Sequence, residues 1–154
     1  MAIDISKGSH AVAFPSKVAA AAGSPHQWDI VLTANADNGT LCTRGDYVSH
    51  FNYKQAAAPS GFEGVIREQS ANGNWYIEVT DADGALLLYN APVSPYGEKE
   101  LQDESLFYNA KDDVVRGYEL IVGDWFEVSK EGFTGVPEAG KAVSYSSGKY
   151  VVAE

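Results

Sequence analysis

Residues 135–142, "GVPEAGKA", come close to the sequence of a phosphate-binding loop. Such a loop needs backbone N–H groups that cradle phosphates, a lysine that reaches them, and a hydroxyl that binds Mg²⁺. Here Ala142 stands at the hydroxyl position, Pro137 lacks an N–H, and Glu138 places negative charge where phosphate would lie. Two β-prone runs around Ser147-Gly148 follow, where a helix would be required. The segment therefore predicts a turn that enters a terminal β-hairpin, with no nucleotide bound.

Other residues with chemical potential lack the partners that chemistry requires. The histidines have no metal-ligand spacing; they are His10, His26 and His50. "DADG" (81–84) begins like a calcium loop, but Leu86 replaces the required glycine and Pro92 the final glutamate. Arg44-Gly45-Asp46 matches the tripeptide that integrins bind, yet Gly-Asp before a β run is ordinary turn chemistry. We therefore predict no catalytic residue, no metal site and no cofactor.

Composition indicates what kind of protein this is and which kinds of partner it is not expected to bind. The chain has 154 residues, 45% of them hydrophobic, and a formal net charge of −10, which argues against nucleic acid or an anionic membrane as partner. It has no apolar run long enough to span a membrane, and its N-terminus does not read as a secretory signal. Cys42 is the single cysteine and is expected to be a small buried hydrophobe. These features indicate one globular domain made in a reducing cytoplasm.

The elements that must position any site are predominantly β-strands. Short β-prone runs alternate with Gly, Asn and Asp turns from Gln27 onward, which is typical of a β-sandwich or barrel. Asn38-Gly39 and Asn72-Gly73 predict tight hairpins, and 85–89 would extend the second hairpin into a meander. Within 125–128, adjacent side chains must point to opposite faces, and we expect Phe126 to face the core and Trp125 to face outward.

Residues 1–26 differ from the rest and predict an extended N-terminal arm ahead of an all-β domain over residues 27–154. The segment is rich in Ala, Ser and Gly, and its one helix-prone stretch, 18–22, is too short to be a stable helix alone. A disordered terminus is the alternative. Its few apolar anchors, too sparse for a core of their own, are expected to dock on a partner; they are Ile3, Ile5, Val12, Phe14 and Val18.

Residues 90–113 interrupt the regular spacing of strands with two prolines and six carboxylates. Long irregular segments in compact domains are usually either functional or disordered. Phe107 and Tyr108 are apolar enough to be fixed against another surface. We therefore expect this pair to contribute to partner binding.

The C-terminal half resembles the auxiliary head proteins of tailed bacteriophages, which decorate or cement the capsid or anchor head fibres. The resemblance rests on "ESLFYNAKDDVVRGYELIVGDWFEVSKEGFTG" (104–135) and on "GKAVSYSSGKYVV", with a Gly-Asp turn entering a strand and a closing hairpin. It implies a small β domain on a shell, with an arm that reaches a neighbour. It implies no catalytic residues.

We therefore expect a non-enzymatic structural protein of the virion, made in the host cytoplasm and located on the capsid surface. Its partners would be the major capsid protein or other head proteins, with self-association left open. The alternative is a carbohydrate-binding module, since aromatic residues make up 12% of the chain and stacked rings bind sugars. An exposed planar row of Trp28, Trp75 or Trp125 would favour that alternative, and burial of all three would count against it. A hydrolase would need two carboxylates facing each other in a deep pocket.

Overall fold

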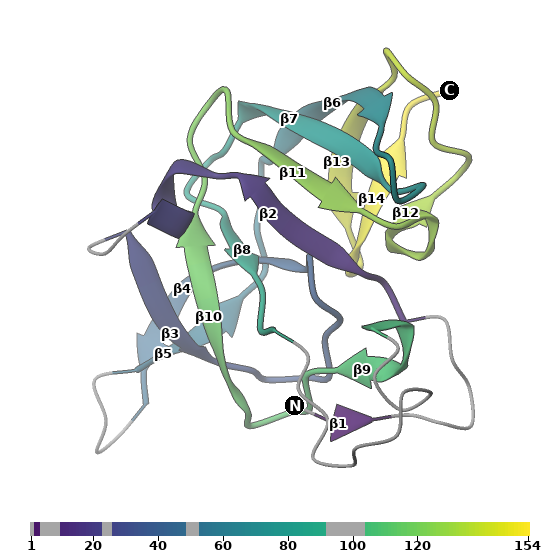
Figure 1. Ribbon diagram of the computed structural model, residues 1–154. Coiled ribbons are helices and arrows are strands. Elements are labelled where there is room, and N and C mark those ends of the chain that lie inside the picture. The colour runs from purple at the N-terminus through teal and green to yellow at the C-terminus, as the bar shows by residue number, and fades with distance from the viewer. Residues whose placement is uncertain (1, 4–9, 23–25, 49–52, 92–103) are drawn as a thin grey trace.

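A computed structural model of the chain describes residues 2–3, 10–22, 26–48, 53–91 and 104–154. These residues form an all-β protein, as predicted, with a closed five-stranded barrel beside an open seven-stranded sheet (Figure 1). The described part of the chain contains no α-helix, and its helical turns are the 3₁₀ segments η1 (Ala19–Ala22), η3 (Glu104–Leu106) and η4 (Lys130–Gly132). A small two-stranded sheet pairs β1 (Ala2–Ile3) with β9 (Phe107–Tyr108).

The barrel closes in the order β10-β3-β5-β4-β8. Its strands are β3 (Gln27–Val31), β4 (Leu41–Tyr47), β5 (Lys54–Ala57), β8 (Leu86–Leu88) and β10 (Val114–Glu119). All neighbours in the barrel are antiparallel except β3 and β5, which run parallel. Closure leaves the barrel without free strand edges.

The open sheet has the order β12-β14-β13-β6-β7-β11-β2. Its strands are β2 (Ala13–Lys17), β6 (Glu63–Gln69), β7 (Trp75–Asp81), β11 (Trp125–Val128), β12 (Phe133–Thr134), β13 (Ala142–Ser146) and β14 (Lys149–Val152). The hairpins β6–β7 and β13–β14 lie where the turn residues predicted them. "GVPEAGKA" enters β13, as expected of a turn before the terminal hairpin.

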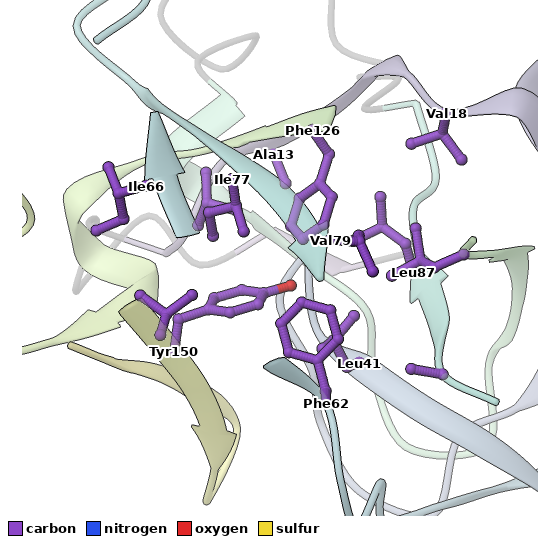
Figure 2. Packing of buried hydrophobic residues seen from close by; sticks show 14 of the residues in the cluster. Ala13, Val18, Leu41, Phe62, Ile66, Ile77, Val79, Leu87, Phe126 and Tyr150 are labelled. Atoms are coloured by element: carbon purple, nitrogen blue, oxygen red, sulfur yellow. The ribbon is translucent and has the colours of Figure 1, made fainter. Parts of the chain in front are cut away.

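The main core lies between one wall of the barrel and the inner face of the open sheet. Phe62, Phe126 and Tyr150 converge there, with ring centroids 5.7–6.4 Å apart (Figure 2). The Tyr150 hydroxyl is satisfied, because it donates a hydrogen bond of 2.6 Å to the carbonyl oxygen of Gly39. Phe126 is fully buried while Trp125 is only half-buried, which confirms the predicted orientation of this pair.

A second, smaller core fills the barrel. Its buried members are Ile30, Leu32, Cys42, Leu86, Leu88 and Val115. Leu87, between two barrel residues of β8, points the other way into the main core. The continuous run of leucines in β8 is therefore buried on both faces, as strands covered on both sides require. Cys42 is buried, as expected.

Two predicted turns connect different strands from those expected. β8 does not extend the β6–β7 hairpin, because its two-sided burial places it in the barrel between β4 and β10. The turn at Asn38 does not join β3 to β4 as a hairpin either, since neither strand pairs with the other. Asn38 instead bonds with the Asn90 backbone at 2.8 and 3.0 Å and accepts a bond of 3.0 Å from the Asn109 amide. Tertiary hydrogen bonds thus set the path of this turn.

The N-terminal segment differs from the expected arm over residues 10–22. β2 is the edge strand of the open sheet and pairs with β11, with Ala13 opposite Val128. Ala13 and Val18 are both buried members of the main core. A Cβ at Gly39 would lie 2.6 Å from the Ala13 Cβ, so the 35–40 turn also packs closely on this strand. Over these residues the segment pairs with and packs against strands of the open sheet.

Candidate protein-binding site

The most prominent exposed apolar group lies at the turn between β10 and β11, where Ile121 and Val122 are 56% and 68% exposed. We call this pair the β10–β11 tip. Figure 1 shows the turn projecting beyond the end of β10, next to η1. The tip lies within residues 104–135, the stretch on which the resemblance to phage head proteins rests, directly before Gly123-Asp124. Adjacent exposed aliphatic side chains can form part of a protein-binding surface.

Asp124 holds the turn in one conformation. Its side chain is buried, and Oδ2 accepts a hydrogen bond of 3.0 Å from the Ile121 N–H while Oδ1 accepts one of 3.2 Å from the Ala19 N–H. Its own N–H donates to the Ile121 carbonyl at 3.1 Å, and its carbonyl accepts from Val79 at 2.9 Å. These bonds tie the turn to η1 on one side and to β7 on the other.

Gly123 permits the sharp change in chain direction at this point. Its φ is +98°, a region that L side chains rarely adopt, and its N–H donates a bond of 3.0 Å to the Val79 carbonyl. The tip is therefore preorganised, and little conformational entropy remains to be lost when a partner covers it. Ala19, whose N–H bonds to Asp124, is itself exposed and adds a small apolar residue beside the tip.

The described residues among those expected to bind a partner make contacts within the chain itself. Val18 is buried in the chain's own core, and Phe14 is half-buried with its ring 6.4 Å from that of Tyr89. The Val12 N–H donates to the Ser129 hydroxyl at 2.9 Å, so this part of the segment is also held internally. In β1 the backbone of Ile3 pairs with that of Phe107. The prediction for Ile5 lies outside the described residues.

Phe107 and Tyr108 are fixed against the chain itself. Phe107 is buried. The half-buried Tyr108 ring stacks on His10 with centroids 5.0 Å apart, and His10 Nδ1 lies 2.7 Å from an Asp37 carboxylate oxygen. Both aromatic residues therefore join the N-terminal segment to the rest of the fold in this structure.

Sequence reasoning missed the β10–β11 tip as a site, although the two aliphatic residues before Gly123-Asp124 were a visible signal.

The three tryptophans do not form an exposed planar row. Each is half-buried. The guanidinium of Arg44 lies 4.5 Å from the centre of the Trp28 ring, and the Lys17 amine lies 5.1 Å from that of Trp125. Trp125 is also tilted by 53° to Tyr76, and Trp75 packs against the main core. The tryptophans are therefore neither exposed as a planar row, which would favour sugar stacking, nor all buried, which would count against it.

Arg44 of the Arg-Gly-Asp tripeptide lies in strand β4 and is engaged by neighbours. Its guanidinium lies 3.8 Å from Glu119, which also accepts hydrogen bonds from the Trp28 indole at 2.6 Å and makes a contact of 3.0 Å with His26. Burial acts to raise the pKa of Glu119, but the bonds from Trp28 and His26 and the charge of Arg44 outweigh it and lower that pKa. The cluster fixes the outer wall of the barrel.

Within the described ranges, no group of three or more His, Cys, Asp or Glu side chains is placed to hold a metal ion. The same part of the chain includes no helix with the length and hydropathy needed to cross a membrane. His50 lies outside the described residues. Comparison with protein-family models, with curated proteins and with solved structures finds no significant match.

Proposed function

We propose that the chain is a non-enzymatic structural protein of a tailed-phage virion, which decorates or cements the capsid by binding the shell protein or another head protein. The observation that carries the proposal is the β10–β11 tip, with Ile121 and Val122 exposed on a turn that Asp124 holds rigid. A rigid aliphatic pair is suited to insert into a shallow apolar depression on a partner. The tip lies within the stretch on which the resemblance to phage head proteins rests.

The edges of the open sheet favour attachment through a turn rather than through strand addition. β2 carries Pro15, which has no N–H to offer a partner strand, and β12 at the other edge is only two residues long. Neither edge is a good template for pairing with another chain. A single tip covers little area, so we expect each contact to be weak and many copies on one shell to be needed for full occupancy.

Co-sedimentation with phage heads tests the proposal. Heads prepared without this protein, from the phage that encodes it, are mixed with the purified chain and pelleted. We expect saturable binding with a fixed number of copies per head, and no binding to heads of an unrelated phage. Failure to pellet with its own heads over a range of salt concentrations would contradict the proposal.

A further inference from the structure

Two Asn-Gly dipeptides occur in the chain, at Asn38-Gly39 and Asn72-Gly73. Asparagine before glycine is prone to an intramolecular reaction, in which the backbone nitrogen of the glycine attacks the side-chain carbonyl carbon of the asparagine. Glycine favours this attack because it has no Cβ to hinder the approach or to restrict the backbone. The reaction also needs a chain segment that can rearrange around the asparagine, so the surroundings of each dipeptide decide whether it occurs.

Asn72 lies in the turn of the β6–β7 hairpin, where residues 71–73 are all exposed. A Cβ added at Gly73 would meet no atom within 4 Å. No hydrogen bond holds the Asn72 side-chain amide to the described part of the chain. The attacking group, the Gly73 N–H, donates a bond of 3.0 Å to the Ser70 carbonyl. Attack therefore requires the release of this backbone bond, which lies in an exposed turn.

Asn38 is only 8% exposed, and both ends of its side-chain amide are bonded. Nδ2 donates a bond of 2.8 Å to the Asn90 carbonyl, and Oδ1 accepts bonds of 3.0 Å from the Asn90 N–H and from the Asn109 amide. The Gly39 N–H, which would be the attacking group here, donates a bond of 2.8 Å to the Leu88 carbonyl. Attack at Asn38 would therefore require these bonds to break in a buried turn.

The two turns also differ in how much of the molecule must move to open them. Proteins open locally with free energies that range from near zero in exposed loops up to the free energy of global unfolding in the core. Bonds between residues 70, 73 and 74 close the turn at Asn72, so it can open alone. The side chain of Asn38 is bonded to residues 52 and 71 positions further along the chain, so its release separates distant segments.

We propose that Asn72 is a site of spontaneous deamidation in the folded protein and that tertiary structure protects Asn38. The Gly73 nitrogen bonds to Cγ of Asn72, the amide nitrogen leaves as ammonia with the proton from the Gly73 nitrogen, and a cyclic succinimide remains. Water then opens the ring at either of its carbonyl carbons, which gives aspartate or isoaspartate. The reaction consumes one water molecule and needs no oxidant, reductant or second protein.

Deamidation changes the charge of this turn and, in the isoaspartate product, its backbone. Both products add one negative charge to a chain whose formal net charge is −10, and isoaspartate also places the side-chain Cβ in the main chain. The turn precedes β7, whereas Val79 near the other end of β7 bonds to Gly123 and Asp124 beside the β10–β11 tip. We therefore expect the contacts that hold the tip to survive the modification.

Peptide mapping by mass spectrometry tests the proposal on the purified full chain, incubated at neutral to mildly alkaline pH. Trypsin cleaves after Arg44 and Arg67, so Asn38 and Asn72 fall in different peptides. We expect the mass increase that marks replacement of NH₂ by OH to appear at Asn72 at least about 10-fold faster than at Asn38, because several more hydrogen bonds must break at Asn38. The rate at Asn72 should rise with pH, because the attacking nitrogen must lose its proton. An unreacted Asn72, or equal rates at the two sites, would overturn the proposal.

Matched variants and the unfolded chain separate the chemistry from the structural protection. Asn72→Gln should abolish the fast reaction, because the longer side chain cyclises much more slowly, whereas Asn74→Gln in the same turn should leave Asn72 as reactive as in the parent. In urea, where tertiary structure is lost, Asn38 and Asn72 should react at similar rates.

Persistence of the fast reaction in Asn72→Gln would place it at another residue, and a slow Asn38 in urea would show that the fold is not what protects it. Either result would overturn the proposal. The reaction needs only the folded chain and water, so its failure leaves the capsid-binding proposal standing, and failure of co-sedimentation leaves the modification site standing.

Discussion

Two strand pairings of the open sheet, β13–β14 and β2–β11, differ in how far apart the paired strands lie in the chain. β14 pairs with β13 across a two-residue turn at Ser147-Gly148, so the contact is local. β2 pairs with β11, more than a hundred residues further along the chain. Local turn chemistry makes the first pairing visible in the sequence, whereas the second pairing depends on a distant partner. A segment poor in large apolar groups can therefore still belong to a core.

Removal of the N-terminal segment is the most severe test of this comparison. A chain that begins at Gln27 lacks β2, and it loses Ala13, Val18 and Ala20 from the core and leaves one side of β11 unpaired. We expect loss of most of the free energy of unfolding, which is about 5–15 kcal/mol for typical domains. Thermal unfolding followed by circular dichroism checks this. A truncated chain that melts at the temperature of the full chain would show that the segment is an arm.

Phe126→Ala should have the next largest effect. Phe126 is fully buried against Phe62 and Tyr150, so its removal leaves a cavity that costs about 3–5 kcal/mol. Trp125→Ala on the outer face of the same strand is the matched control and should be less destabilising. Urea denaturation measures both, and equal small losses would mean that β11 is not packed as described.

Loss of the Asp124 carboxylate should make the turn between β10 and β11 more mobile and leave the packing of the core unchanged. Asp124→Ala leaves the N–H groups of Ile121 and Ala19 without their acceptor, and we expect a loss of about 1–3 kcal/mol. Amide hydrogen exchange should show increased exchange at these two residues, with the β13–β14 hairpin protected as before. Unchanged exchange at both would contradict the role assigned to Asp124.

The smallest expected effect is a pH dependence from Glu119. Because its pKa is lowered in the folded protein, its contribution is present above the ordinary glutamate pKa of about 4.3 and is lost as pH falls through the lowered value. The melting temperatures of the parent and of Glu119→Gln should therefore differ at neutral pH and converge in acid. A difference that stays constant down to low pH would contradict this account.

Sequence patterns predicted those parts of the fold that local chemistry decides. Asn72-Gly73 specified the β6–β7 hairpin, and the alternation within 125–128 correctly placed Phe126 inward. The path of the Asn38 turn depends instead on hydrogen bonds to Asn90 and Asn109, which no local pattern contains. Val18, assigned to partner binding, is buried in the chain's own core, because an apolar residue docks equally well on its own chain.

The candidate site was predictable only in part. Gly-Asp at 123–124 was recognised as a turn, but its rigidity comes from the Asp124 bonds to Ala19 and Val79, on segments far away in sequence. The cavity at the end of the barrel could not be predicted, because its lining comes from five separate stretches of chain, at 32–36, 40–42, 56–59, 88 and 145–148. Turn positions follow from residue types, whereas surfaces and cavities follow from how distant turns meet.

We propose that the β10–β11 tip attaches the protein to the phage head, and a comparison of two charged variants tests this attachment. Val122→Asp places a charge on the exposed tip, and Val136→Asp places the same charge on an exposed valine elsewhere, at 73% exposure, as the control. Both variants should keep the parent's melting temperature. In co-sedimentation with heads, we expect Val122→Asp to lose most of its binding and Val136→Asp to pellet as the parent does. Equal binding of Val122→Asp and the parent would contradict the claim.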